Sequence, residues 1–294
     1  MAQITEIKES INTAVDKIES QKDPSHTLEE TDFALALALE FPKIMNHKNG
    51  YRNIKFGGCY IHPYQMVNVI ANGFPYPYCK LGDLLVLVRK HSNKYVRYNA
   101  ALIQFMQIKK TDANPIVIKD PINQATSSLY RQWPLFNLVS SQRNPYDIYP
   151  KTVSQGALYC IIKPVRKKEW QFYMAEPMQQ MVYDSQMTLA RYIRDSMNWQ
   201  TGRSISIESD SGSDEWSKLI WDLIKQAEKT AAYRNEINYY SPSSLSDNFL
   251  HLMLEKQGIN LSVPTDGINQ SNDDVDGMSI LFIDIDGCEG EQEN

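Results

Sequence analysis

The chain has 294 residues, of which 42% are hydrophobic and 22% are charged, and its formal net charge is −5. This composition is typical of a globular protein and excludes a disordered or membrane-embedded chain. No apolar run approaches the roughly 20 residues that a membrane helix needs, and the charged residues at positions 1 to 20 leave no apolar core for a signal peptide. We therefore expect a cytoplasmic protein. Its four cysteines are far apart, so we expect reduced thiols rather than disulfides or a zinc knuckle.

The charges are unevenly distributed along the chain. Nine acidic residues follow Lys256, the last basic residue, and the rest of the chain has 30 basic and 26 acidic residues. Between residues 48 and 170, 18 Lys and Arg residues stand against five Asp and Glu residues. A chain that is acidic overall could therefore present a basic face to a polyanion, although lysines scattered over the surface would give the same count.

Two helices are predicted in the first 42 residues. The first spans residues 3 to 20. The second begins at Thr27, whose hydroxyl caps it in a capping box with Glu30, and it ends near Pro42. Its side chains are apolar on most sides, which predicts a buried helix with Glu40 as a carboxylate at its end.

Loops and strands are predicted next. Residues 46 to 58 favour a polar loop leading into a short strand, and residues 63 to 78, rich in proline and aromatic side chains, favour an irregular surface loop. The basic segment between the two strongest strands is short enough for an antiparallel hairpin or a brief excursion. The predicted strands span residues 84 to 88, 100 to 108, 135 to 140 and 157 to 165.

The periodicity of the second half is mainly helical. Residues 186 to 199 and 213 to 235 repeat apolar side chains at helical spacing, and Ser213 is the predicted N-cap of the second of these helices. Residues 262 to 277 are rich in Asp and Asn and are predicted to form a mobile acidic linker. The apolar run from residue 278 to residue 286 is predicted to form a strand that returns to the fold.

The two strongest strands carry the candidate catalytic residues. Asp83 precedes the first strand, and Gln107 and Lys109 end the second, where alternation places both on one face. If Asp83 lies across from them, Asp83 and Gln107 supply oxygen ligands to Mg²⁺ or Mn²⁺, the metal activates a water, and Lys109 stabilises the charge of the phosphorane. The alternative is structural: a turn residue at Asp83 and a solvated strand end at Gln107 and Lys109.

This pattern resembles a known family. Asp83 followed by Gln107-x-Lys109 is similar to the D…(D/E/Q)xK signature of the PD-(D/E)xK, or restriction-endonuclease-like, nucleases in its QxK variant. The segments Leu81-Gly82-Asp83-Leu84-Leu85, Ala101-Leu102-Ile103-Gln104 and Tyr130-x-x-Trp133-Pro134-x-Phe136 resemble uncharacterised bacterial proteins associated with phage defence. The resemblance covers roughly residues 27 to 110, continues more loosely to about residue 165, and leaves the C-terminal third unexplained.

The resemblance implies an α/β fold with a restriction-endonuclease-like central mixed β-sheet flanked by helices and a mainly helical C-terminal part. It also implies Glu40, on the helix before the sheet, as a further catalytic residue and metal ligand. Together with the composition, it predicts a nuclease-like core at residues 1–170, a helical part packed on the core at residues 171–261, the linker at residues 262–277, and a terminal strand with an acidic tail at residues 278–294.

The predicted function is a divalent-metal-dependent nuclease that hydrolyses phosphodiester bonds. DNA is favoured over RNA by the resemblance, which also implies anti-phage defence with a partner protein. The alternative is a catalytically inactive subunit of the same fold that binds nucleic acid or another protein. Lys110, Arg131 and Arg143 are the candidate contacts to nucleic acid, through its phosphates.

Three other motifs have competing interpretations. The aromatic cluster around Trp133 is interpreted as a core plug, with a base-stacking platform as the alternative. Asp284-Ile-Asp286-Gly287 mimics the DxDG motif of haloacid-dehalogenase-like phosphatases, but only seven residues follow it, whereas that motif begins a Rossmann-like domain. The acidic tail is interpreted as a solvated segment, or as a DNA mimic that occupies the basic face.

Overall fold

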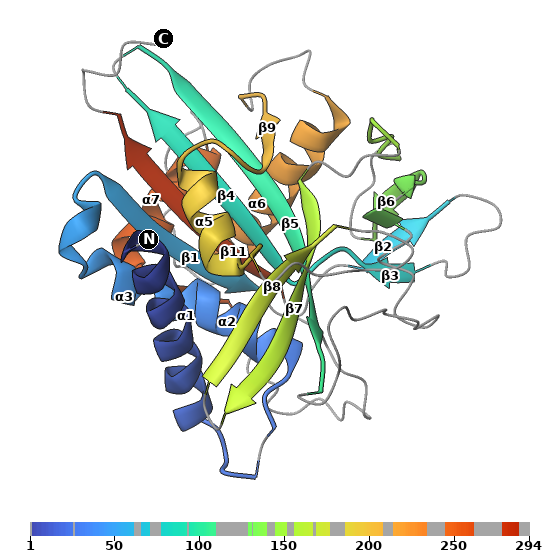
Figure 1. Ribbon diagram of the computed structural model, residues 1–294. Helices are drawn as coiled ribbons and strands as arrows, with labels where there is room; N and C mark the ends of the chain where they lie inside the picture. The colour runs from blue at the N-terminus through green and yellow to red at the C-terminus, as the bar shows by residue number, and fades with distance from the viewer. Residues whose placement is uncertain are drawn as a thin grey trace.

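A mixed β-sheet with the strand order β10-β1-β11-β4-β5-β7-β8 forms the centre of the computed structural model, and β9 pairs with β5 beside this path (Figure 1). The structure describes residues 2–25, 27–61, 66–70, 78–92, 94–109, 129–130, 132–139, 145–151, 156–166, 169–176, 186–207, 214–233, 245–261 and 278–287. The predicted α/β class, with helices flanking a mixed sheet, is confirmed.

The strands of the main sheet come from both halves of the chain. The pairs β1–β11, β4–β5, β5–β9 and β7–β8 are antiparallel, whereas β1–β10, β11–β4 and β5–β7 are parallel. The bounds of these strands are β1 Ile54–Ile61, β4 Leu84–His91, β5 Val96–Gln107, β7 Ala157–Arg166, β8 Glu169–Ala175, β9 Arg203–Ile205, β10 Ile259–Asn260 and β11 Met278–Asp286.

Helices cover both faces of this sheet. On the near face in Figure 1 lie α1 (Ala2–Ser20), α2 (Glu30–Leu39) and α5 (Leu189–Met197), and on the far face lie α6 (Glu215–Tyr233) and α7 (Leu245–Lys256). Two separate clusters of buried apolar side chains fill the spaces between sheet and helices. A sheet that is covered on both faces requires apolar side chains at successive positions, which explains the uninterrupted run Leu84 to Val88 in β4.

The returning strand predicted at residues 278 to 286 is confirmed, and it lies in the middle of the sheet. β11 pairs with β1 on one side and with β4 on the other, and its first eight residues are buried. The predicted domain bounds stay a prediction, but the boundary at residue 170 falls inside β8, and strands from the first and last predicted segments share one sheet.

The start of α2 differs from the sequence prediction. Thr27 lies outside the helix, and Glu29 is the N-cap, in a capping box with Asp32. The predicted box, Thr27 with Glu30, is therefore wrong by two positions. Glu29 and Asp32 are acidic, and carboxylates at a helix N-terminus also interact favourably with the helix dipole. Pro42 does not end this helix but lies in the first turn of the short helix α3 (Phe41–Asn46), where proline is well tolerated.

Two predicted loops contain regular structure. The 3-10 helix η1 (Asn49–Tyr51) and the first residues of β1 lie within the segment predicted as a polar loop. The proline- and aromatic-rich segment contains β2 (Met66–Val69) and leads into β3 (Tyr78–Lys80), which form a small antiparallel sheet with β6 (Phe136–Leu138). These strands were not predicted because a strand of three or four residues, flanked by turn-forming residues, is too short to show a recognisable alternation of apolar and polar side chains.

β1 passes between α2 and α7 at a pair of glycines. A Cβ atom added at Gly57 would lie 2.6 Å from the carbonyl carbon of Met253 in α7. One added at Gly58 would overlap the carbonyl oxygen of Ala38 in α2. The helices on the two faces therefore approach the backbone of β1 more closely than any side chain at these positions would allow.

None of the helices in the described part of the chain combines the length and the hydropathy needed to cross a membrane.

Asp214, rather than the predicted Ser213, caps α6, and Ser213 lies outside the described residues. One carboxylate oxygen of Asp214 accepts hydrogen bonds from the backbone N–H groups of Trp216 at 2.9 Å and Ser217 at 3.2 Å. The helix then buries the predicted apolar face completely or nearly so: Trp216, Leu219, Ile220, Leu223 and Ile224.

Asp214→Ala is expected to lower the free energy of unfolding by about 1 kcal/mol, because two N–H groups of the first turn lose their acceptor. Chemical denaturation with urea measures this change. Lys218→Ala is the control, since it removes only a half-exposed ion pair with Glu215 and should change stability by less than about 0.5 kcal/mol. Equal effects of the two substitutions would contradict the assignment of Asp214 as the cap.

Candidate functional site

Asp83 extends the β4–β5 ladder by one residue. β4 and β5 pair with Leu84 opposite Ile103, so Asp83 lies opposite Gln104, and its backbone N–H donates to the carbonyl of Ile103 at 2.9 Å. The Asp83 carboxylate accepts hydrogen bonds from the backbone N–H of Phe105 at 2.6 Å and from the side-chain amide of Gln104. The ammonium of Lys80 forms an ion pair with the same carboxylate. Asp83 is completely buried.

The environment of Asp83 disfavours its charge. Burial raises the pKa of the Asp83 carboxyl from 3.8 to about 6, and the nearby charge of Glu30 acts in the same direction. The charge of Lys80 and the Phe105 N–H act in the opposite direction but do not cancel the effect of burial. At neutral pH the group is therefore an ionised carboxylate that depends on three internal donors.

Gln107 and Lys109 lie away from these donors. The backbone N–H of Gln107 donates to a carboxylate oxygen of Glu30 at 3.0 Å, and Lys109 lies exposed beyond the end of β5. The side-chain amide that contacts the Asp83 carboxylate is therefore that of Gln104 rather than the predicted Gln107, and the role of Lys109 stays a prediction. The physical reason is the antiparallel register, which brings residue 104 next to Asp83 and carries residue 107 three positions past it.

The glutamate of α2 that contacts the sheet is Glu30 and not the predicted Glu40. Glu40 lies at the junction of α2 and α3, where it forms ion pairs with Lys17 at 3.3 Å and Lys43 at 2.8 Å. Burial alone would raise the pKa of Glu40, but these two lysines outweigh burial and lower it. Glu30, at the other end of the ten-residue helix α2 and about 15 Å away along its axis, is the glutamate that reaches the end of β5.

Sequence reasoning missed Gln104 and Lys80 as partners of Asp83. The match to a QxK pattern drew attention to Gln107-x-Lys109, although Gln104 was the polar residue inside the second apolar strand. Counted from Gln104, the pattern reads Gln104-x-Met106, with a thioether in the place of the lysine. Lys80, three residues before Asp83, supplies the ammonium instead. Only the pairing register of the hairpin could have identified Gln104.

The two motifs that carried the family resemblance form one packed unit. The hydroxyl of Tyr130 donates to the carbonyl of Leu81, and a Cβ atom at Gly82 would lie 2.7 Å from that hydroxyl. Tyr130, Trp133 and Phe136 are completely buried. The interpretation of this cluster as a core plug is confirmed, and the base-stacking platform is wrong. Lys110, Arg131 and Arg143 lie outside the described residues.

The residues at this end of the sheet do not fit the predicted Mg²⁺ or Mn²⁺ ion. Such ions need several oxygen ligands with water access. In the ranges that the structure describes, no three His, Cys, Asp or Glu side chains lie close enough to hold an ion together. Asp83, the central predicted ligand, is buried and already bound by Lys80, Gln104 and Phe105.

The chain was compared with family models, curated proteins and solved structures. None of them matches it. The restriction-endonuclease-like topology and the predicted nuclease activity stay predictions, and the site is interpreted from its own geometry.

Proposed function

We propose that this protein binds nucleic acid and does not cut it by a metal-dependent route. This corresponds to the inactive alternative predicted from the sequence. The observation that carries the proposal is the condition of Asp83: its carboxylate joins the ends of β4 and β5 inside the protein and exposes no oxygen atom to an incoming ion.

The place of the lysine supports the same proposal. In the D…QxK signature the lysine stabilises charge that develops on the phosphorane. The register gives Asp83 and Gln104-x-Met106 in this chain, so an apolar thioether stands two residues after the glutamine. Lys80 does not replace that lysine functionally, because its ammonium is held in an ion pair by the buried carboxylate.

The nucleic-acid part of the proposal has two supports. One is the resemblance of Asp83 followed by Gln107-x-Lys109 to the signature of restriction-endonuclease-like nucleases. The other is the local excess of basic residues between positions 48 and 170. Polyanions bind such surfaces by releasing counterions, which requires no metal and no catalytic group.

The full chain is expected to shift the mobility of labelled duplex and single-stranded oligonucleotides without cutting them in the presence of excess Mg²⁺ or Mn²⁺. Binding should be unchanged when EDTA replaces the metal ion. Gel-shift and supercoiled-plasmid cleavage assays on the same preparation measure both properties.

Asp83→Asn is the control for cleavage. Metal-dependent cleavage by the wild type that is lost in Asp83→Asn would show that Asp83 is catalytic, and it would overturn the non-cutting part of the proposal. Cleavage that is equal in both proteins identifies a contaminating nuclease. Failure of the wild type to bind any nucleic acid would overturn the proposal as a whole.

A further inference from the structure

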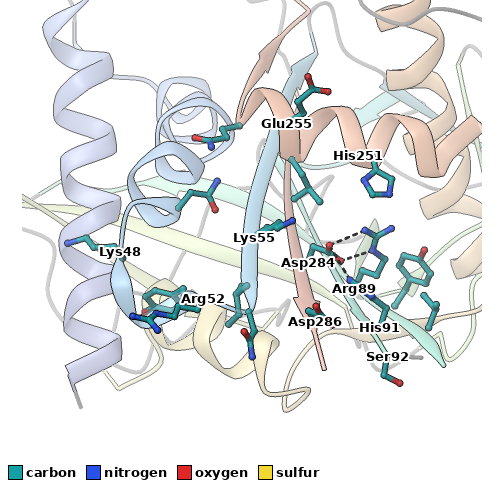
Figure 2. Close-up of a pocket in the computed structure, with 18 of the residues that line it drawn as sticks. Lys48, Arg52, Lys55, Arg89, His91, Ser92, His251, Glu255, Asp284 and Asp286 are labelled. Carbon is teal, nitrogen blue, oxygen red and sulfur yellow. Dashed lines mark hydrogen bonds and ion pairs between the residues drawn. The ribbon is translucent and has the colours of Figure 1, made fainter. Parts of the chain in front are cut away.

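A large open groove lies at the opposite end of the sheet from Asp83. Asp83 precedes β4, and His91 ends it, so roughly 25 Å separates the groove from the buried carboxylate. The groove has a volume of about 1020 Å³ and lies between the segment that joins α3 to β1, the last residues of β4 and β11, and α7 (Figure 2). Among the residues that line it, Lys48, Arg52, Lys55 and Arg89 belong to the basic segment between residues 48 and 170, and Asp284 and Asp286 to the DxDG-like motif.

The floor of the groove is a buried ion pair between β4 and β11. Arg89 donates to both carboxylate oxygens of Asp284, at 2.6 and 3.0 Å, and its guanidinium lies over the ring of Phe282. Burial alone would lower the pKa of Arg89, but the hydrogen bonds and charge of Asp284 raise it. His91 lies 3.4 Å from the same carboxylate. The negative charge of Asp284 is therefore neutralised within the floor.

Basic side chains border the groove on the side of η1 and β1. Figure 2 shows Lys48 and Arg52 there, with Lys55 between them and the floor. Arg52 and Lys55 are exposed, and within the ranges that the structure describes neither forms an ion pair with a carboxylate. Lys48 is only weakly paired, at 3.8 Å from Glu6. An anion in the groove can therefore interact with the side chains of Lys48, Arg52 and Lys55.

Two acidic residues also border the groove. Glu255 on α7 and Asp286 at the end of β11 are exposed, and His251 lies near Glu255 on the same helix. Asp286 lies beside Arg52 along the β1–β11 pair, because its backbone N–H donates to the carbonyl of Asn53 at 2.9 Å. Exposed cations and carboxylates therefore alternate along this end of β1 and β11, and the contacts open to an anion are the separate side chains of Arg52 and Lys55.

The lining favours nucleic acid over an acidic peptide. Peptide grooves gain affinity from apolar pockets for side chains, but the aliphatic residues among the described ones that line this groove are Ile54, Val96 and Leu254. Tyr51 and Tyr98 also line the groove, but both are buried, so neither presents a ring for stacking against a base. The available groups are charged and polar donors, which contact phosphates.

We infer that this groove binds the phosphate backbone of nucleic acid, with Arg52 and Lys55 as the principal contacts and with no reading of base sequence. The inference rests on the proposed function, and it adds the place and the mode of binding. The buried Arg89–Asp284 ion pair forms a neutral floor beneath the bound backbone, and Lys48 extends the basic side.

Fluorescence anisotropy with a labelled 20-base-pair duplex of about two helical turns, and with one of its strands, tests the inference in the full chain. The variant is Arg52→Gln/Lys55→Gln. At about 0.1 M salt one phosphate contact accounts for roughly an eightfold change in affinity, so two lost contacts should weaken binding about 60-fold. The slope of log affinity against log salt should fall by about 2. Duplexes of different sequence should bind equally.

The matched control is Lys163→Gln/Arg166→Gln, which removes the same charge from the other end of the sheet. β5 begins at the groove with Val96 and ends at Gln107, which pairs with Ile162 in β7, so Lys163 and Arg166 lie beyond that distant end. The control should bind within about twofold of the wild type, and its salt slope should be unchanged. Arg52→Gln alone should weaken binding about eightfold.

Several results would overturn the inference. If Arg52→Gln/Lys55→Gln binds nucleic acid with the affinity of the wild type, the groove is not the binding site, although the proposed function is unaffected. If the control variant Lys163→Gln/Arg166→Gln weakens binding equally, binding depends on the net charge of the protein and not on the groove. Displacement of the duplex by an equal charge concentration of polyglutamate would assign the groove to an acidic protein. Absence of any nucleic-acid binding by the wild type would overturn both the function and the groove.

Discussion

Gly58→Ala is expected to lower the free energy of unfolding by about 3 kcal/mol or more, a large fraction of the roughly 5 to 15 kcal/mol of an ordinary protein. The added methyl group would overlap the carbonyl oxygen of Ala38 in the backbone of α2. α2 cannot retreat freely, because Phe33 and Leu37 are completely buried in the cluster that it shares with β4 and β11. Circular dichroism during urea denaturation measures the change.

Gly50→Ala is the matched control for this substitution. A Cβ atom at Gly50 would meet only a carboxylate oxygen of Glu6 at 3.9 Å, which is an ordinary contact. Its effect should remain within about 0.5 kcal/mol. If Gly58→Ala proves as stable as Gly50→Ala, then α2 does not pack on the backbone of β1 as closely as described.

Asp83→Asn is expected to change the pH dependence of stability more than any other single substitution at this end of the sheet. The pKa of Asp83 is raised to about 6 in the folded protein, above its ordinary value of 3.8. Between these values the folded state binds more protons than the unfolded state, so raising the pH through this window destabilises the wild type. Two pKa units correspond to about 3 kcal/mol.

Asparagine cannot ionise, so the stability of the variant does not fall as the pH rises through the pKa of Asp83. The unfolding free energy of Asp83→Asn minus that of the wild type should therefore increase by about 3 kcal/mol between pH 4 and pH 7, measured by urea denaturation at a series of pH values. Lys80→Met is the informative comparison. It removes the charge that lowers the pKa of Asp83, so its destabilisation should continue above pH 6. A difference between Asp83→Asn and wild type that stays constant with pH would contradict this account.

The strand pair was predictable because its signal is local. The apolar runs beginning at Leu84 and Ala100, with a short basic turn between them, predicted β4 and β5, and these strands form an antiparallel hairpin. The helix at α6 was predictable for the same reason, since Trp216, Leu219 and Ile220 recur at helical spacing and are all buried. In each case a pattern within one segment determines which side chains enter the core.

The partners of Asp83 were not predictable, because register is not a local property. Shifting the hairpin by one residue exchanges the face of every side chain in the strand. The Gln104 and Gln107 alternatives therefore differ only in a pairing that the sequence does not state. The choice of Glu40 over Glu30 failed for a related reason: the two carboxylates are at opposite ends of one helix, and the direction in which that helix crosses the sheet decides which of them reaches β5.

The groove was missed because its members come from four distant segments. Arg52, Arg89, His251 and Asp284 become neighbours only when β11 enters the sheet beside β4 and α7 packs over its end. No spacing rule connects such residues. The local excess of basic residues from position 48 onward was the one available signal. It indicated positive charge but not where that charge lies in the fold.

The central position of β11 has a consequence for biosynthesis. About 190 residues separate the end of β4 from the start of β11. Ribosomes add roughly 5 to 20 residues per second, so β1 and β4 emerge about 10 to 40 seconds before the strand that must join them. During that interval each nascent chain has two apolar strand edges without a partner, and neighbouring chains on one messenger can pair through them. Yields of soluble protein should therefore fall when translation is slowed, and rise with chaperones that shield strand edges.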